Sequence, residues 1–181
     1  MAEEVGGGGC KGKDKVMIAI DESECSHYAL EWVLDNLKES ITTTSPIFIF
    51  TAEPIADLSY IYAASLGSAR MSLSLSLSLS LSLSTTPELI RSVQEHQKTV
   101  SSALLTKAKD ICASRGVIAE TITEVGDPKE AICDAVVKYN INLLVLGNHG
   151  KGAIQRAFLG SVSNYCVHNA KCPVLVVKKP H

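Results

Sequence analysis

Residues 143–152 read Leu-Leu-Val-Leu-Gly-Asn-His-Gly-Lys-Gly, and a further glycine stands at position 160. The apolar run has the length of a strand and does not alternate with polar residues, which is typical of a strand covered on both faces in a parallel sheet. After the glycine-rich segment, a helix is expected from about Ser161 to His168. A buried strand, a glycine-rich loop and a helix in this order indicate the edge at which doubly wound α/β sheets bind their ligands.

The alternation of strand-like and helical segments continues through the rest of the chain. Four further strands are expected at 16–20, 47–50, 117–125 and 173–177. Helical periodicity or helix-start signals lie between them, at 24–38, at 86–116 and from Asp127-Pro128 onward. The pattern therefore predicts an α/β domain with five strands in a parallel sheet and crossover helices on its faces. In the third strand, one set of alternate residues is expected on a common side: Val117, Ala119, Thr121, Thr123 and Val125.

Composition bounds the class of protein. The chain has 181 residues, 46% of them hydrophobic and 20% charged, which indicates one globular domain. A formal net charge of -2 argues against sequence-independent binding of nucleic acid or of an anionic membrane, because such binding needs a surplus of Lys and Arg. No apolar run reaches about 18 residues, and the first residues lack the features of a signal peptide. We expect a soluble, cytoplasmic protein, with the nucleus as an open alternative, whose six cysteines are buried or idle thiols.

Two segments stand apart from this pattern. Residues 1–14 contain four consecutive glycines and are expected to form a disordered tail before a domain at 15–181. Residues 71–85 enclose a strict Ser-Leu alternation, from Ser72 to Ser84, in the connection after the second strand. Its period of two would also suit a half-buried strand. We favour an expanded CT repeat at the gene level, and hence a low-complexity surface insert that the domain tolerates.

Two well-known glycine loops are excluded by spacing. A P-loop that ends in Gly150-Lys151 would need a glycine where Val145 stands and a hydroxyl residue where Gly152 stands. The dinucleotide pattern Gly-x-Gly-x-x-Gly, started at Gly150, fails because position 155 is Gln. The loop can still hold an anion through bare backbone N–H groups and the start of the following helix, although an ordinary connecting loop remains the alternative.

The glycine spacing and two further motifs resemble those of the universal stress protein family. The glycines form the pattern Gly-x2-Gly-x9-Gly-Ser, which ends at Ser161; Asp21 closes the first strand, and Gly126-x-Pro128 follows the third. The resemblance extends from about Lys15 to Lys178 apart from the insert, and the last strand and its preceding helix look like those of single-domain plant members. It implies a Rossmann-like, doubly wound sheet of five parallel strands, which in one branch of the family binds ATP or AMP.

The resemblance also implies which residues bind the nucleotide. Those expected at the adenosine are Ile20, Asp21, Ala52, Gly126 and Leu146. Those expected around the ribose and phosphates are Gly147, His149, Gly150, Gly160, Ser161, Val162 and Ser163. Magnesium would come with the nucleotide, and no protein ligand for it is identified. Relatives dimerise through the last strand, so a homodimer through Val174–Val177 is expected as well.

Several alternatives stay open at this stage. Asp21 can equally cap the helix that begins near Glu24, and His149 can be an ordinary loop residue. Lys151 and Arg156 can neutralise phosphate charge or point into water. At the level of function, a nucleotide-binding stress or signalling protein, with a protein partner left open, competes with a slow ATPase or phosphotransferase and with a nucleotide-independent chaperone or adaptor. No catalytic residue is assigned, because the sequence shows no recognisable nucleophile, base or metal pair.

Overall fold

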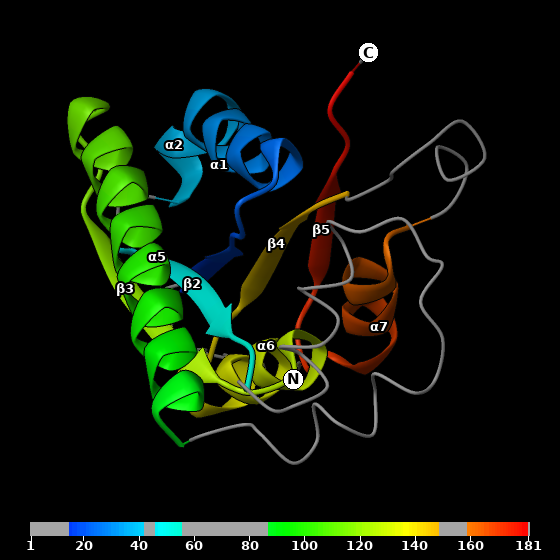
Figure 1. Cartoon of the computed structure of the whole chain (residues 1–181). Coiled ribbons are helices and arrows are strands. Elements are labelled where there is room, and N and C mark those ends of the chain that lie inside the picture. Colours follow the sequence, from blue (N-terminus) through cyan, green and yellow to red (C-terminus); the bar gives the residue numbers. More distant parts are fainter. Residues whose placement is uncertain (1–14, 42–45, 56–86, 149–158, 181) are drawn as a thin grey trace, which may run out of the picture.

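The computed structural model describes residues 15–41, 46–55, 87–148 and 159–180. Its five strands are all parallel and form one sheet in the order β3-β2-β1-β4-β5 (Figure 1). Their bounds are β1 Val16–Ala19, β2 Ile47–Glu53, β3 Ala119–Val125, β4 Leu143–Gly147 and β5 Val174–Val177. The predicted sheet of five parallel strands is confirmed.

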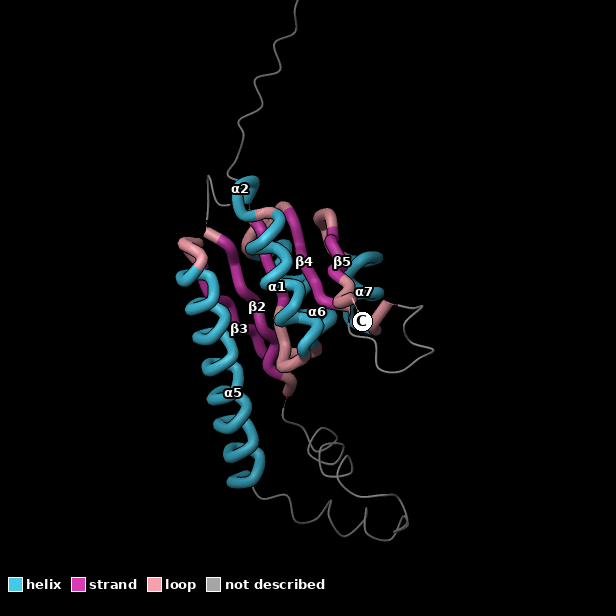
Figure 2. The backbone as a smooth tube through the Cα atoms, turned by 90° about the horizontal axis from the view of Figure 1, so that it is seen from above, coloured by secondary structure: helices cyan, strands magenta, loops and turns pink. Residues whose placement is uncertain are grey.

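Helices cover both faces of the sheet (Figure 2). Their bounds are α1 Glu24–Asn36, α2 Lys38–Ile41, α5 Pro87–Ser114, α6 Pro128–Lys138 and α7 Ser161–Asn169. Side chains of α1 and α5 share one hydrophobic cluster with one face of the sheet, whereas α6 and α7 share a second cluster with the other face. This is the doubly wound arrangement, in which each strand of the centre is buried on both sides.

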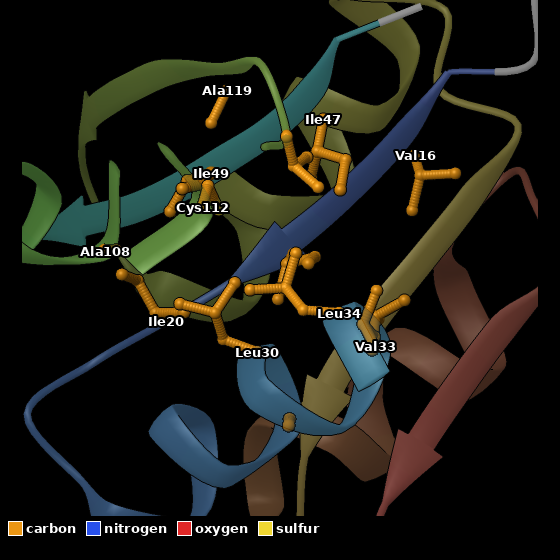
Figure 3. Packing of buried hydrophobic residues seen from close by; sticks show 14 of the residues in the cluster. Val16, Ile20, Leu30, Val33, Leu34, Ile47, Ile49, Ala108, Cys112 and Ala119 are labelled. Carbon is orange, nitrogen blue, oxygen red and sulfur yellow. The ribbon is translucent and has the colours of Figure 1, made fainter. Parts of the chain in front are cut away.

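Alternation along β1 shows how one strand serves both layers. Ile18 and Ile20 belong to the cluster with α1 and α5, and Met17 and Ala19 belong to the cluster with α6 and α7. Figure 3 shows the first of these layers, where side chains of α1 such as Leu30 point toward the sheet. A run without polar residues is therefore required here, because neither face of the strand reaches water.

The strand order creates a crevice between β1 and β4. The chain leaves β1 into α1 on one face, and it leaves β4 toward α7 on the opposite face. α1 and α7 thus pack on opposite faces after two neighbouring strands, and the carboxyl ends of such strands are the position where open α/β sheets bind ligands.

The third strand differs from its sequence pattern. The strand begins at Ala119 and not at Val117; these two residues are buried, whereas Thr121 and Thr123 are exposed and Val125 is 67% exposed. Because β3 is an edge strand, alternation sets the side of the sheet on which a residue lies, while α5 buries only part of that side.

The predicted tail at 1–14 and insert at 71–85 lie outside the described residues. Among the described helices, none is long and apolar enough to cross a membrane.

Candidate functional site

A pocket of about 210 Å³ lies at the carboxyl ends of β1 and β4; we call it the β1/β4 pocket. Four parts of the structure enclose it: the start of α1, the start of α6 with Pro128 and Ile132, the carboxyl ends of the strands, and the start of α7. Nine of the twelve sequence-predicted residues line it, namely Ile20, Asp21, Ala52, Leu146, Gly147, Gly160, Ser161, Val162 and Ser163. The wall is mostly apolar, and no Lys or Arg is among the described residues that line it.

Three of the twelve predicted residues are not among the described residues that line the pocket. Gly126 lies in the turn between β3 and α6, where its N–H donates to the Glu53 carbonyl at 2.9 Å, and the nearby Pro128 lines the pocket instead. His149 and Gly150 lie outside the described residues, as do Lys151 and Arg156. Sequence reasoning also missed lining residues from the sheet and from the start of α1: Ala19, Phe50, Ser23 and Ser26.

At the start of α1, side chains of the same segment accept hydrogen bonds from backbone N–H groups. Ser23 is the N-cap, and its Oγ accepts from the Ser26 N–H at 3.2 Å. Asp21 holds the turn before it, because its Oδ1 accepts from the Ser23 N–H at 3.0 Å and from the Ser23 hydroxyl. The Ser26 hydroxyl contacts the Asp21 carbonyl at 2.8 Å. The capping role that the sequence left open for Asp21 therefore belongs to Ser23.

An ion pair joins this helix start to the C-terminal segment. Lys179 Nζ donates to Glu24 Oε2 at 2.6 Å, across 155 positions of sequence. The hydrogen bond and the positive charge of Lys179 lower the pKa of the Glu24 carboxyl below its usual value. Glu24 also stands in the first turn of α1, where a negative charge complements the helix dipole.

Gly147, the last residue of β4, touches the backbone of α1. A Cβ at this position would lie 2.5 Å from the Cys25 carbonyl oxygen and 2.7 Å from the Ser26 nitrogen. Neither atom belongs to a flexible side chain, so no larger residue fits without moving α1 away from the sheet. The sequence suggested close approach of a ligand to Gly147, whereas the structure shows close approach of the protein's own helix.

The start of α7 is built differently. Its N-cap is Gly160, no side chain caps the helix, and its first turn contains no acidic residue. Ser163 is buried at 3% exposure, and its hydroxyl donates to the Gly160 carbonyl at 3.0 Å, while Ser161 is exposed. The first turn of a helix presents N–H groups that have no acceptor within the helix. At α7 the residues that carry these groups, Gly160 and the three that follow it, line the β1/β4 pocket.

Asn148 joins the pocket residues Gly147 and Gly160 through a covalent bond and a hydrogen bond, and the sequence analysis gave it no role. Its Oδ1 accepts from the Gly160 N–H at 3.1 Å, and its own N–H donates to the Val177 carbonyl at 2.9 Å. The residue therefore links the end of β4 to the N-cap of α7 and to β5. Its residue type could have indicated this role, because Asn side chains readily form hydrogen bonds with backbone groups at the ends of strands and helices.

The cavity adjoins a wider hollow of about 890 Å³. The two share four lining residues, Asp21, Ser23, Ala52 and Pro128, and residues of α5 such as His96 and Gln97 line the far side of the wider one. The β1/β4 pocket alone is smaller than the roughly 300–1,000 Å³ of a typical ligand site, and the adjoining hollow adds the room that a ligand of nucleotide size needs.

The chemistry available around the pocket is that of hydrogen bonding. Among the described residues, no group of three or more His, Cys, Asp or Glu side chains is placed to hold a metal. The five described cysteines are free thiols, as expected. Burial raises the pKa of Cys166, which lies in the second turn of α7, to about 12. Such a thiol stays protonated and is a poor nucleophile.

Comparison with known proteins agrees with the fold and identifies the family. The model of the Universal stress protein family matches residues 13–178. The chain is 28% identical over 179 residues to a "Universal stress protein A-like protein" of Arabidopsis thaliana, which covers 91% of this chain and 90% of that protein. It is 30% identical over 170 residues to a universal stress protein of Synechocystis, with 92% and 99% covered.

Solved structures show the same architecture. A universal stress protein family protein from Arabidopsis thaliana, crystallised with AMP bound, has a TM-score of 0.62 and 26% identity, and 92% of each chain is covered. A universal stress protein in complex with cAMP has a TM-score of 0.57 and 21% identity over 93% of this chain and 98% of that one, a likeness that concerns the fold alone. The match of the family model over nearly the whole chain and these shared folds show that the chain belongs to the universal stress protein family.

Proposed function

We propose that this protein binds an adenine nucleotide, ATP or AMP, in the β1/β4 pocket, and that nucleotide occupancy is a regulatory state in a stress response or in signalling. The observation that carries the proposal is the start of α7, which has neither a side-chain cap nor an acidic residue and stands in the wall of a pocket. Unfilled N–H groups at a helix start attract phosphate through hydrogen bonds and the helix dipole. Since no Lys or Arg is among the described lining residues, backbone donors take the place of side-chain charge.

The other end of the pocket suits adenosine. Ile20, Ala52 and Leu146 supply apolar surface for a flat base. Asp21 lies at the carboxyl end of β1, where a carboxylate can accept hydrogen bonds from ribose hydroxyl groups. Because the Ser23 N–H and hydroxyl bond to Asp21 Oδ1, the carboxylate is held in place before a ligand arrives. A pre-positioned acceptor reduces the entropy lost on binding.

The phosphates would lie between the glycine-rich segment and α7. The N–H groups of Ser161, Val162 and Ser163 are the proposed donors, with Gly147 and Gly160 at the two ends of the segment that also carries His149 and Gly150. Magnesium, when present, would be held by the phosphates, since no protein ligand for it is identified. The AMP-bound Arabidopsis structure, which is 26% identical to this chain, supports the choice of an adenine nucleotide.

We also propose a homodimer that forms through β5. This strand lies at an edge of the sheet, and only its last residue, Val177, is fully buried. An apolar edge strand with unpaired backbone groups tends to pair with another strand. Val176→Lys should shift the protein toward the monomer in size-exclusion chromatography with light scattering. A dimer of unchanged mass would place the interface elsewhere, and a monomeric parent would contradict the dimer.

The experiment for nucleotide binding has two arms. Nucleotide released from the purified, denatured protein is identified by chromatography, and ATP, AMP and GTP are titrated into the nucleotide-free protein by calorimetry. We expect ATP or AMP in the first arm and tighter binding of adenine than of guanine nucleotides in the second. Gly150→Val should lose affinity without a matching loss of thermal stability, because a branched side chain is placed where the anion approaches. A folded Gly150→Val protein that binds ATP as well as the parent would overturn the phosphate site.

A further inference from the structure

Asn148 joins three elements at the carboxyl edge of the sheet, beside the β1/β4 pocket. It follows β4 directly, its N–H reaches Val177 of β5, and its Oδ1 reaches the Gly160 N–H across twelve residues. Because the Gly160 N–H is a donor, the side-chain oxygen of Asn148 and not its NH2 group must face it. The bond holds the N-cap of α7 at a set position relative to the end of β4.

This contact decides which backbone donors of α7 remain for a ligand. A helix begins with four N–H groups that have no intrahelical acceptor, those of the N-cap and of the next three residues. Asn148 takes the first, at Gly160. The donors of Ser161, Val162 and Ser163 follow, and all three residues line the pocket. An anion at α7 would therefore meet three donors in a preset orientation.

The neutrality of Asn148 is the second observation. A carboxylate would be the stronger partner for a helix N-terminus, because it forms charge-assisted hydrogen bonds and complements the helix dipole. The other two helices with a defined N-cap follow that rule: α1 has Ser23 and Glu24, and α6 has Asp127 and Glu130. At α7 the first turn carries no acid and the contact to Gly160 comes from an uncharged amide. Helix stability is thus not maximised at the end that faces the pocket.

We propose that Asn148 is a positioning residue that makes the start of α7 selective for phosphorylated ligands. Its uncharged oxygen holds Gly160 in place, and it adds no negative charge beside the position of the phosphates. The inference rests on the proposed function, since it names the part of the chain that distinguishes ATP and AMP from adenosine. The inference also predicts that helix stability and ligand binding favour different residues at position 148: aspartate for the stability of α7, and asparagine for the binding of phosphates.

The test compares three variants with the parent protein. ATP, AMP and adenosine are titrated by calorimetry into the parent, Asn148→Asp, Asn148→Ala and Asn164→Asp, and thermal melting is recorded without nucleotide. Asn164→Asp is the matched control, because it adds the same charge to the exposed side of α7 beyond the first turn and outside the pocket lining.

The expected results differ between the variants. Asn148→Asp should melt at or above the temperature of the parent, bind ATP about tenfold more weakly, bind AMP less weakly than that, and bind adenosine as the parent does. Asn148→Ala should melt lower and bind both phosphorylated ligands about threefold more weakly, because the hydrogen bond to Gly160 is lost. Asn164→Asp should bind all three ligands like the parent.

Each contrary result has a distinct meaning. A parent protein that binds none of the three ligands contradicts the proposed function itself. If the parent binds them and Asn148→Asp keeps the same ratio of ATP to adenosine affinity, the function stands and the role of Asn148 is wrong. An Asn148→Asp protein that melts well below the parent also contradicts this role, because a carboxylate at that position should stabilise α7.

Discussion

The starts of α1 and α7 follow neighbouring strands of the same sheet, yet they are built in opposite ways. At α1, Ser23 caps the helix and Glu24 complements its dipole. At α7, Gly160 provides no side chain, and the first turn has no acidic residue. Both starts line the β1/β4 pocket, but the N-cap side chain accepts from a first-turn N–H group only at α1, where Ser23 bonds to Ser26. The difference shows that a helix start can bind a ligand where the sequence supplies neither a capping side chain nor an acidic residue in the first turn.

The largest expected effect concerns the packing of α1. Gly147→Ala should lower the free energy of unfolding by about 3 kcal/mol, because a Cβ 2.5 Å from the Cys25 carbonyl oxygen forces α1 away from β4. Urea denaturation followed by circular dichroism measures the change. Gly160→Ala is the matched control: the φ of Gly160 is -60°, which alanine adopts freely, so its cost should be about 0.5 kcal/mol. Equal losses in the two variants would contradict the structural distinction between the two helix starts.

The second prediction asks whether the α1 side contributes to binding through Asp21. Asp21→Asn should weaken AMP binding by about 2 kcal/mol, because a charged acceptor for the ribose hydroxyl groups is lost. Binding of tripolyphosphate, which has no ribose, should be unaffected. Calorimetry on both ligands makes the comparison, with Glu120→Gln, an exposed residue of β3, as the control. A parallel loss for tripolyphosphate would show that Asp21 acts on the whole pocket rather than on the adenosine end.

The smallest effects distinguish the two helix starts directly. Ser23→Ala should lower the free energy of unfolding by about 1 kcal/mol, the usual cost of a lost N-cap. Ser161→Ala should leave stability unchanged and weaken ATP binding by only about 0.5 kcal/mol, because the neighbouring N–H donors remain. Thermal melting and calorimetry on both proteins give the result. A loss of stability in Ser161→Ala as large as that in Ser23→Ala would mean that α7 is capped after all.

The sequence predicted what depends on local pattern. The five strands follow from apolar runs of strand length, and the N-cap of α6 follows from Asp127-Pro128, where the Asp127 side chain accepts from the Lys129 N–H at 2.9 Å. Nine of the twelve candidate residues line one pocket because strand ends and helix starts of a parallel sheet meet at one edge. Whether they bind a nucleotide stays a prediction.

What the sequence did not predict depends on contacts between distant residues. The clash that excludes a side chain at Gly147 involves Cys25, more than a hundred positions away, and no spacing rule connects the two. The bond from Asn148 to Gly160 requires the two ends of a glycine-rich segment to meet. The exposure of Thr121 and Thr123 depends on how much of the edge strand α5 covers, which periodicity does not encode.

The ion pair between Lys179 and Glu24 has a practical consequence for work on this protein. Since all strands run in one direction, the described chain enters at the amino edge of the sheet before Val16, and it leaves β5 at the opposite edge. Lys179 holds the departing segment against the start of α1, and the first residues of α1 border the pocket. A purification tag or fluorescent protein fused after residue 180 would therefore begin next to the start of α1, and such a fusion should be tested for interference with ligand binding.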